Sequence, residues 1–533
     1  MDSIHSIAEN DSQIRESTAA MMVAAGMTPE LLAIVEQYKR DARENPEREM
    51  LISHAVKSAD CDKIRLLIKL GADLNYRSKH GGSLLSIAAY AERMDVVDLL
   101  LEVGAPVDDG SAIQRLSYDQ FDAVEKLLER GADPAPLKWT PLHHAVALGT
   151  LRQMEDLLAE GADPEARDHY GRTAFLLAIE TGDTAKTSTL LAHGARREVA
   201  SPQESPPAHY PIPRDDLRML QWLFDQGFDI HQKDGNGHGT LFEAVRHSAV
   251  KCFKFLLTKG GPFPEILDDD CVSEATSPEI IGLLYERGAD LTKLERPALR
   301  DFIGLGNIPY LPVGEAEYLE GRFRQFGTSN PERMKIPFWD AMIRCGWEAS
   351  QATDQFGDSS CGRSNPVWCH HRFGMSLTKL PDGRFVQIAG EHEDHYDPDF
   401  CIYNEVIVHD GRGGFEVFGY PEDIFPPTDF HSATLVMPWI YVIGSLGYRS
   451  HRKAARGETP VYRWHVETGV IERVVIPPGS PGWIYHHQAE LHGDRIRIYG
   501  GRIETIDEAD KQQTVDNEAI WELDLNSLVW IRV

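Results

Sequence analysis

The sequence lacks several patterns that would each point to a class of protein. Its seven cysteines are scattered and form no Cys-x-x-Cys pair, which argues against a disulfide-rich secreted domain and a paired-cysteine zinc site. The longest apolar run, TLVMPWIYVIGSLGY, is too short to cross a bilayer and contains Pro438. The opening MDSIHSIAENDSQIRES has no basic segment followed by an apolar core, so we expect no secretory signal. Together these absences favour a reducing, cytoplasmic location.

Positive charge is also scarce. Lys and Arg total 54 against 83 Asp and Glu, which leaves a net charge of −29, and no run of basic residues stands out. Because affinity for phosphate needs a concentrated positive face, we expect neither nucleic acid nor an anionic membrane as partner. The acidic surplus instead favours a basic protein partner.

A repeat occupies much of the first half of the chain. Thr140 and Thr173 are 33 residues apart, and the same interval separates Ala145 from Ala178. Leucine-rich segments end on a glycine again and again, at residues 71, 104, 131, 161, 194, 227, 260 and 288. Self-similarity at such a period is typical of a stacked repeat array.

Elementary physical chemistry explains each repeated unit. Thr140 suits a helix N-cap, and Pro141 suits the first helical position, where its missing N–H costs nothing. Ala145 is small, so another helix can approach it closely. A second short helix ends where Gly161 supplies the left-handed residue, and residues 162–173 then form a hairpin-like finger. Neither helix can bury its apolar face alone, so neighbouring units must stack into an α-solenoid.

These units resemble ankyrin repeats. The resemblance rests on the Thr-Pro-Leu-His segment at 140–143 and on the recurring Gly-Ala-Asp segments, and it extends over residues 47–292. It implies a rigid curved array that binds proteins. Residues 1–46 are expected to form an N-terminal segment with a capping helix at 28–45. The pattern is interrupted near Ser111, between 197 and 214, and after Gly260.

The second half of the chain follows a different pattern. Residues 293–371 are predicted to be a linker with helical and irregular parts, and strand-like runs dominate 372–533. Gly390, Gly444 and Gly500 end β-rich segments at intervals of 54 and 56 residues, and each period holds about four antiparallel strands. The Tyr-Gly-Gly segment at 499–501 resembles kelch-type β-propeller repeats.

The fold predicted for the whole chain is therefore an α-solenoid of ankyrin repeats followed by an all-β kelch-like domain. Three four-stranded blades are recognisable, which describes an incomplete propeller. Either the segment from Trp339 to His371 covers an open strand edge, or a second copy of the chain closes the ring by oligomerisation.

Side chains of the fingers and first helices are the predicted partner-binding residues, because aromatic and long polar groups on a rigid platform make binding anchors. They are Arg77, His80, Lys138, Trp139, His169, Tyr170, Asn236 and His238.

One loop in the second half has the composition of a metal site. The segment GEHEDHYDPDF offers imidazole nitrogens and carboxylate oxygens, which are ligands for a divalent metal. The candidate ligands are His392, Asp394, His395, Asp397 and Asp399. The alternative is a solvated acidic loop without a metal.

Other histidines of the second half are interpreted as structural. His370 and His371 follow Cys369, but a second pair of cysteines for a zinc site is absent. His431 and His487 open two blades at equivalent positions, which favours a packing role over a shared channel, and Asp429 is a candidate to orient the His431 ring.

No complete catalytic signature is present, and no cofactor other than the possible metal is implied. We therefore expect a protein–protein interaction scaffold or adaptor that binds its partner on the concave ankyrin face. The alternative is a metal-dependent enzyme with its site in the β domain and an ankyrin array that recruits the substrate.

Overall fold

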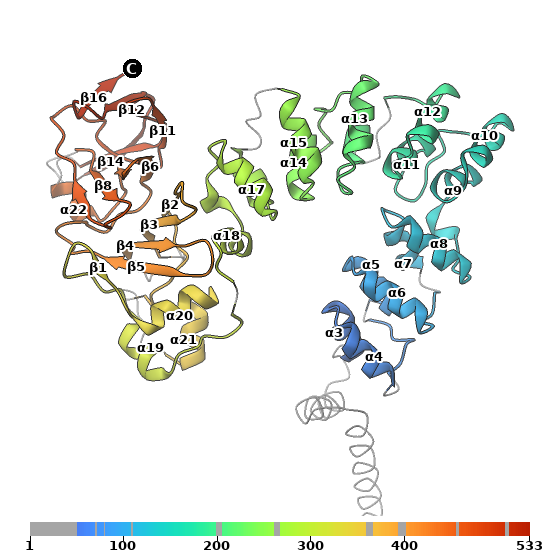
Figure 1. Ribbon diagram of the computed structural model, residues 1–533, viewed down its shortest axis with the longest axis horizontal. Helices are drawn as coiled ribbons and strands as arrows, with labels where there is room; N and C mark the ends of the chain where they lie inside the picture. The colour runs from blue at the N-terminus through green and yellow to red at the C-terminus, as the bar shows by residue number, and fades with distance from the viewer. Residues whose placement is uncertain are drawn as a thin grey trace, which may run out of the picture. The chain divides into compact units, whose positions relative to one another are not determined.

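The computed structural model describes residues 51–533 with short gaps at 70–71, 79, 108–109, 199–204, 261–266, 307, 359–365, 393–400, 455–457 and 507–510. The predicted capping helix at 28–45 lies outside the described residues. The chain forms two compact units, Met1–Lys259 and Gly260–Val533 (Figure 1). The finer boundaries expected from the sequence, at 46/47, 292/293 and 371/372, stay predictions.

The described part of the first unit consists of short helices that follow one another in pairs (Figure 1). They are α3 (Leu51–Lys57) and α4 (Cys61–Lys69), α5 (Leu84–Tyr90) and α6 (Met94–Glu102), α7 (Gly110–Leu116) and α8 (Phe121–Glu129), α9 (Pro141–Ala147) and α10 (Leu151–Ala159), α11 (Ala174–Glu180) and α12 (Thr184–Ala192), and α14 (Thr240–Arg246) and α15 (Val250–Thr258). In the proline-rich interruption, a single 3-10 turn, η2 (Pro207–His209), precedes α13 (Leu217–Asp225).

The predicted start and stop signals of the helices are confirmed. The Thr140 hydroxyl accepts a hydrogen bond from the His143 N–H, and Thr173 does the same for Leu176. The glycines after the second helices have φ between 77° and 92°, in the left-handed region where a Cβ is strained. They are Gly104, Gly131, Gly161, Gly194, Gly227, Gly260 and Gly288.

Small and apolar side chains fill the interior of the stack. Ala145 and Ala178, which share one position of the repeat, are buried together with Leu142, Phe175 and Leu190 in one cluster. The close packing of alanine-bearing first helices explains why the period is visible in the sequence.

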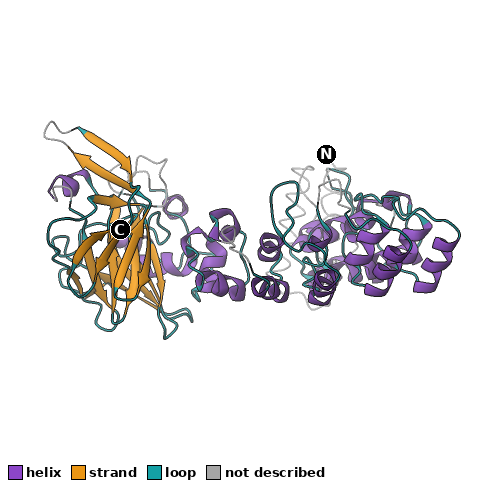
Figure 2. Cartoon of the chain, turned by 90° about the horizontal axis from the view of Figure 1, so that it is seen from above, coloured by secondary structure: helices purple, strands orange, loops and turns teal. Residues whose placement is uncertain are grey.

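Strands dominate the second unit, where they form four antiparallel sheets among the described residues (Figure 2). In spatial order the sheets are β1 (Glu332–Arg333), β5 (Phe415–Gly419), β4 (Ile402–His409), β3 (Phe385–Glu391) and β2 (Ser376–Lys379); β6 (Ser432–Val436), β7 (Trp439–Ile443), β8 (Val461–His465) and β9 (Ile471–Arg473); β11 (Gln488–His492), β12 (Arg495–Tyr499), β15 (Trp521–Asp524) and β16 (Val529–Arg532); and β10 (Trp483–Tyr485), β13 (Arg502–Ile506) and β14 (Gln512–Asp516).

The three larger sheets are layered. Strand β6 lies next to both β2 and β11, so one edge strand of each of these sheets neighbours an edge strand of the next. One apolar cluster joins the first and second sheets through Val406 and Ile440, and another joins the second and third through Ile443 and Ile496. The repeated sheets match the predicted four strands per period, but within the described ranges they close into neither a barrel nor a propeller.

Helices of the second unit cover the first sheet. Phe302, in α18 (Arg296–Phe302), meets Phe385 of β3 edge to face at 5.3 Å, and the Trp339 ring, in α20 (Pro337–Cys345), stacks on Trp368 at 4.8 Å. The remaining helices of this unit are α16 (Asp269–Ser273), α17 (Pro278–Tyr285), α19 (Glu315–Gly321), α21 (Ala349–Phe356) and α22 (Arg449–Ala454), with the 3-10 turn η4 (Leu291–Lys293). No helix in the described ranges has the length and apolarity of a bilayer span.

Candidate functional site

The fingers that carry the predicted binding residues are tight hairpins. In one finger the Asp168 N–H donates to the Arg172 carbonyl at 3.0 Å, and the Asp168 carboxylate accepts from the Arg172 N–H at 2.9 Å. Asp234 and His238 make the same two bonds in a later finger, at 2.9 Å each. These bonds fix the backbone of the finger and so present its side chains in a defined direction.

The first finger borders a groove. Arg77 and His80 are exposed, and beside His80 a groove of about 650 Å³ runs between the finger and the neighbouring helices. Tyr90, at the end of α5, lines this groove and is 64% exposed. Sequence reasoning missed Tyr90, although a large aromatic at the end of a first helix is a usable signal for a binding surface.

Four predicted binding residues are brought together by two later fingers, those that precede α9 and α11. The His169 N–H donates to the Leu137 carbonyl at 2.9 Å. This bond places His169 and Tyr170 next to Lys138 and Trp139. The Gln114 side chain lies 3.2 Å from the His169 ring, and its backbone carbonyl accepts from the Tyr170 hydroxyl at 3.0 Å. The two fingers are thereby held against the preceding repeat.

Aromatic rings extend this surface. Tyr118 and Tyr170 meet edge to face at 5.5 Å, and the Arg115 guanidinium lies 5.6 Å from the Tyr118 ring. Trp139 is half-buried and packs edge to face with His144 at 6.4 Å. Burial raises the pKa of the Tyr118 hydroxyl to about 12, so that group stays neutral at physiological pH. We call Arg115, Tyr118, Lys138, Trp139, His169 and Tyr170 the finger patch.

A buried ion network lies beneath the finger patch. The Arg172 side chain is 1% exposed, and its guanidinium pairs with the carboxylates of Asp168 and Glu180. The same guanidinium donates to the backbone carbonyls of Ser117 and Tyr118 in the preceding repeat, at 2.8 and 3.1 Å. Burial raises the pKa of Glu180 to about 7, against the opposing effect of Arg172. The network fixes the finger to the preceding repeat. No local pattern in the sequence predicts it.

The last two predicted binding residues lie on a separate finger. Asn236 is exposed at the tip, whereas His238 is half-buried and its ring stacks on Phe242 at 3.9 Å. These residues are therefore part of the same series of fingers but not of the finger patch.

The predicted metal loop of the second unit is described only at its first ligand. His392 is buried, and its Nε2 donates to the Val367 carbonyl at 3.1 Å. Asp394, His395, Asp397 and Asp399 lie outside the described residues, so the predicted ligand set remains a prediction.

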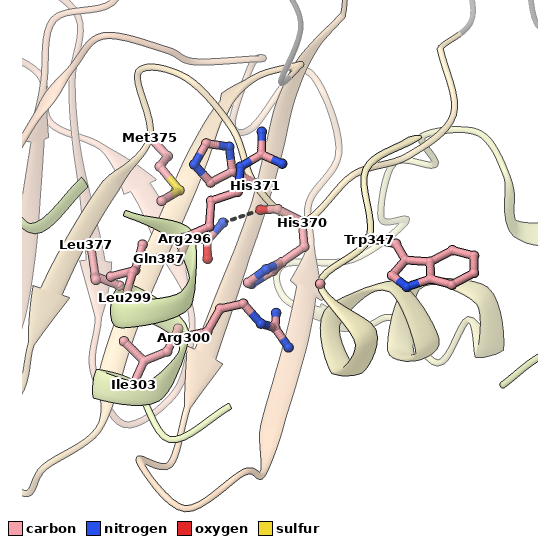
Figure 3. A pocket seen from close by; sticks show the side chains of 11 residues that line it. Arg296, Leu299, Arg300, Ile303, Trp347, His370, His371, Met375, Leu377 and Gln387 are labelled. Atoms are coloured by element: carbon pink, nitrogen blue, oxygen red, sulfur yellow. Dashed lines mark hydrogen bonds between the residues drawn. The ribbon is translucent and has the colours of Figure 1, made fainter. Parts of the chain in front are cut away.

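A small cavity lies between α18, the end of α20 and the first sheet (Figure 3). Its walls combine apolar side chains with basic groups. They are Arg296, Leu299, Arg300, Ile303, Gly346, Trp347, His370, His371, Met375, Leu377 and Gln387. The volume of the cavity that the centre of a water molecule can reach is about 20 Å³. This volume suits one ordered water and excludes a substrate-sized group.

The basic groups of this cavity have structural partners. The Arg300 guanidinium donates to three backbone carbonyls, those of Gly306, Ile343 and Arg344. Arg296 pairs with Glu348 at 2.7 Å. Burial and then the charge of Arg296 lower the pKa of His371 to about 4. Among the described residues the Nε2 of the buried His370 has no hydrogen-bond partner, and an ordered water would satisfy it.

A larger groove of about 830 Å³ lies elsewhere in the strand-rich unit. Its walls include the acidic side chains of Glu422, Asp423 and Glu458, with Tyr462 and Trp483 as aromatic walls. The Trp483 N–H donates to the Leu446 carbonyl at 3.1 Å, so this ring is fixed. The groove is large enough for a peptide side chain or a small molecule.

Comparison with known proteins identifies the helical repeats. Residues 110–201 match the family of ankyrin repeats, in three copies. This stretch contains the whole finger patch and the Arg172 network. The predicted ankyrin region is confirmed there, whereas the kelch resemblance of the strand-rich unit has no such support.

Curated relatives agree with this assignment. The chain is 40% identical to the 2-5A-dependent ribonuclease of Mus musculus over 75 residues, which cover 13% of this chain and 10% of that protein. It is 25% identical to Protein VAPYRIN-LIKE of Medicago truncatula over 246 residues, 38% of this chain and 50% of the relative. It is also 24% identical over 189 residues to the Putative ankyrin repeat protein YahD of Escherichia coli (strain K12), with 26% of this chain and 94% of the relative covered. The chain thus spans a tenth to a half of the length of the first two relatives.

Proposed function

We propose that the chain is a protein–protein interaction scaffold or adaptor that binds a partner protein through the finger patch. Ankyrin repeats imply a role in protein binding, and the repeats of this chain are recognised over the segment that carries the patch. The observation that carries the proposal is the joining of two fingers by Gln114, whose side chain donates to the Pro136 carbonyl at 2.9 Å and lies 3.2 Å from the His169 ring. With the bond from the Tyr170 hydroxyl, this residue holds the finger side chains in place before any partner arrives. A preorganised patch loses less entropy on binding than a mobile one.

The chemistry of the finger patch suits a protein partner. Tyrosine, tryptophan and arginine are the residues that most often dominate binding energy at interfaces. The rings of Tyr118 and Tyr170 already lie against the guanidinium groups of Arg115 and Arg172. A basic partner is favoured instead by the net charge of −29, which steers such a protein toward the chain.

Affinity capture with the full chain tests this function. We compare the proteins retained by the wild-type chain, by a Lys138→Ala/His169→Ala/Tyr170→Ala variant, and by a matched control. The control is Arg152→Ala/Glu155→Ala, which changes exposed residues on α10. The proposal requires a partner that binds the wild type and the control directly but not the patch variant. Equal capture by all three chains would remove the finger patch from the function.

The strand-rich unit enters the proposal as a second binding surface. The layered antiparallel sheets with strand β6 beside β2 and β11 support a kelch-like arrangement, and the 830 Å³ groove offers a place for a ligand. The alternative of a metal-dependent enzyme predicts stoichiometric metal that is lost in a His392→Ala/His395→Ala variant, which elemental analysis of the purified chain measures.

A further inference from the structure

Two fingers of the ankyrin repeats share a backbone but differ at one decisive side chain. Asp234 and His238 stand 66 residues after Asp168 and Arg172, and both hairpins are closed by the same two hydrogen bonds. In the earlier finger, the guanidinium at the second position neutralises two carboxylates, those of Asp168 and Glu180. In the later finger an imidazole stands in its place.

Two carboxylates and one imidazole lie close together at the later finger. They belong to Asp234 and His238 of the finger and to Glu243 of α14. One carboxylate oxygen or ring nitrogen from each side chain lies within 4.8 Å of the other two. All three side chains are half-buried. One Asp234 oxygen accepts the backbone N–H groups of Asn236 and His238, at 2.9 Å each, and the second oxygen accepts the side-chain amide of the exposed Asn236 at 3.3 Å.

Neighbouring groups hold the three side chains in position. The His238 ring stacks on Phe242, and the His247 Nε2 lies 3.4 Å from the Glu243 carboxylate. Arg246, on the same helix, is 53% exposed and lies farther from the Glu243 carboxylate, at 3.9 Å.

We propose that Asp234, His238 and Glu243 form a binding site for a zinc ion, in a finger that carries an imidazole where the earlier finger carries the Arg172 guanidinium. One imidazole and two carboxylates match the ligand preferences of Zn²⁺, and three protein ligands leave a fourth position for water. Ligand atoms at about 2.0–2.2 Å from one ion are about 3.3 Å apart, so small side-chain rotations close the site. The ion joins the finger to α14, as Arg172 joins its finger to Glu180.

Zinc titration of the chelator-treated full chain tests the site. Competition with a coloured chelator measures the affinity and the number of zinc ions bound, and cobalt substitution reports the ligands. We expect the wild type to bind about one ion more than the Glu243→Gln and His238→Arg variants. The His193→Ala variant, which changes an exposed histidine at the end of α12, is the control and keeps the ion.

Two further measurements separate this site from other causes. Thiolates of the free cysteines give cobalt an intense charge-transfer band, and the proposed site, with nitrogen and oxygen ligands, does not. The His238→Arg variant carries the guanidinium of the earlier finger, so we expect it to keep the fold by circular dichroism. Zinc raises the melting temperature of the wild type and of His193→Ala, but not that of the two site variants. Equal zinc affinity and stoichiometry in the wild type and both site variants would overturn the proposal.

Discussion

The Ser376 hydroxyl and the His431 Nε2 lie 2.8 Å apart, and the same pair recurs one sheet later, where Ser432 and His487 are 2.9 Å apart. In both cases the histidine directly precedes the edge strand of one sheet and reaches the edge strand of the sheet before it. The packing role predicted for these histidines thus has a specific form, a bond between neighbouring sheets. The predicted orienting role of Asp429 is wrong, because its Oδ1 accepts from the Ser445 hydroxyl and the Gly447 N–H instead.

Removal of one of these rings should loosen the layered sheets. We expect His431→Ala to lower the free energy of unfolding of the strand-rich unit by about 2–4 kcal/mol, because it leaves a cavity and an unpaired hydroxyl on the half-buried Ser376. Chemical denaturation followed by tryptophan fluorescence measures the change. His492→Ala, at an exposed position, should change the free energy by less than about 0.5 kcal/mol. Similar losses for both variants would contradict the inter-sheet role.

The buried histidines also predict acid sensitivity. Burial lowers the pKa of His409 and His431 to about 3, and that of His487 to about 4, below the value of about 6.5 in an unfolded chain. The unfolded chain therefore binds more protons between these values. The stability that the neutral rings contribute is complete above about pH 6.5 and is lost as the pH falls toward 4.

Urea unfolding of the strand-rich unit across pH 4–8 measures this dependence. We expect the free energy of unfolding to fall with acid at up to about 1.4 kcal/mol per pH unit for each ring. A His409→Leu variant should show a shallower slope than the wild type, because one titrating ring is gone. The same slope in the wild type and in His409→Leu would contradict the prediction, because it would mean that His409 is protonated equally in the folded and unfolded states.

Removal of the Arg172 guanidinium should strongly destabilise the ankyrin repeats. Arg172→Met leaves the carboxylates of Asp168 and Glu180 buried without their partner, so we expect a loss of about 3–5 kcal/mol from the stability of the ankyrin repeats. The double variant Arg172→Met/Glu180→Leu should recover part of this loss, since one buried charge is removed with it. Far-ultraviolet circular dichroism during thermal unfolding measures both. A double variant no more stable than Arg172→Met would argue against charge burial as the cause.

The glycines that end the second helices offer a test of backbone conformation. Gly161 has φ of 91° and open space around a would-be Cβ, so Gly161→Ala should destabilise the repeats by about 1 kcal/mol through backbone strain alone. Gly282, inside α17, has the same open surroundings but no positive φ. Gly282→Ala should therefore be neutral or stabilising by up to about 1 kcal/mol. Calorimetry of the two variants distinguishes strain from a steric clash.

Local patterns explain how much of the fold was predictable. Thr140 caps its helix by bonding to a residue three positions away, and Gly161 ends the next helix through its own dihedral angle. Both effects therefore depend on residues that are close together in the sequence. The strand periods in the second half are local in the same sense. How the sheets pair, and whether a ring forms, depends on contacts between segments more than fifty residues apart.

The sequence by itself determined the repeat and the ends of its helices, because these depend on neighbours along the chain. Only the tertiary structure decided which side chains meet: Arg172 with Glu180, Gln114 with His169, and Asp234 with Glu243. Each of these pairs joins separate elements of the fold. In an array of similar units, one different side chain, such as His238 in place of an arginine, changes the local chemistry but leaves the repeat pattern in the sequence intact.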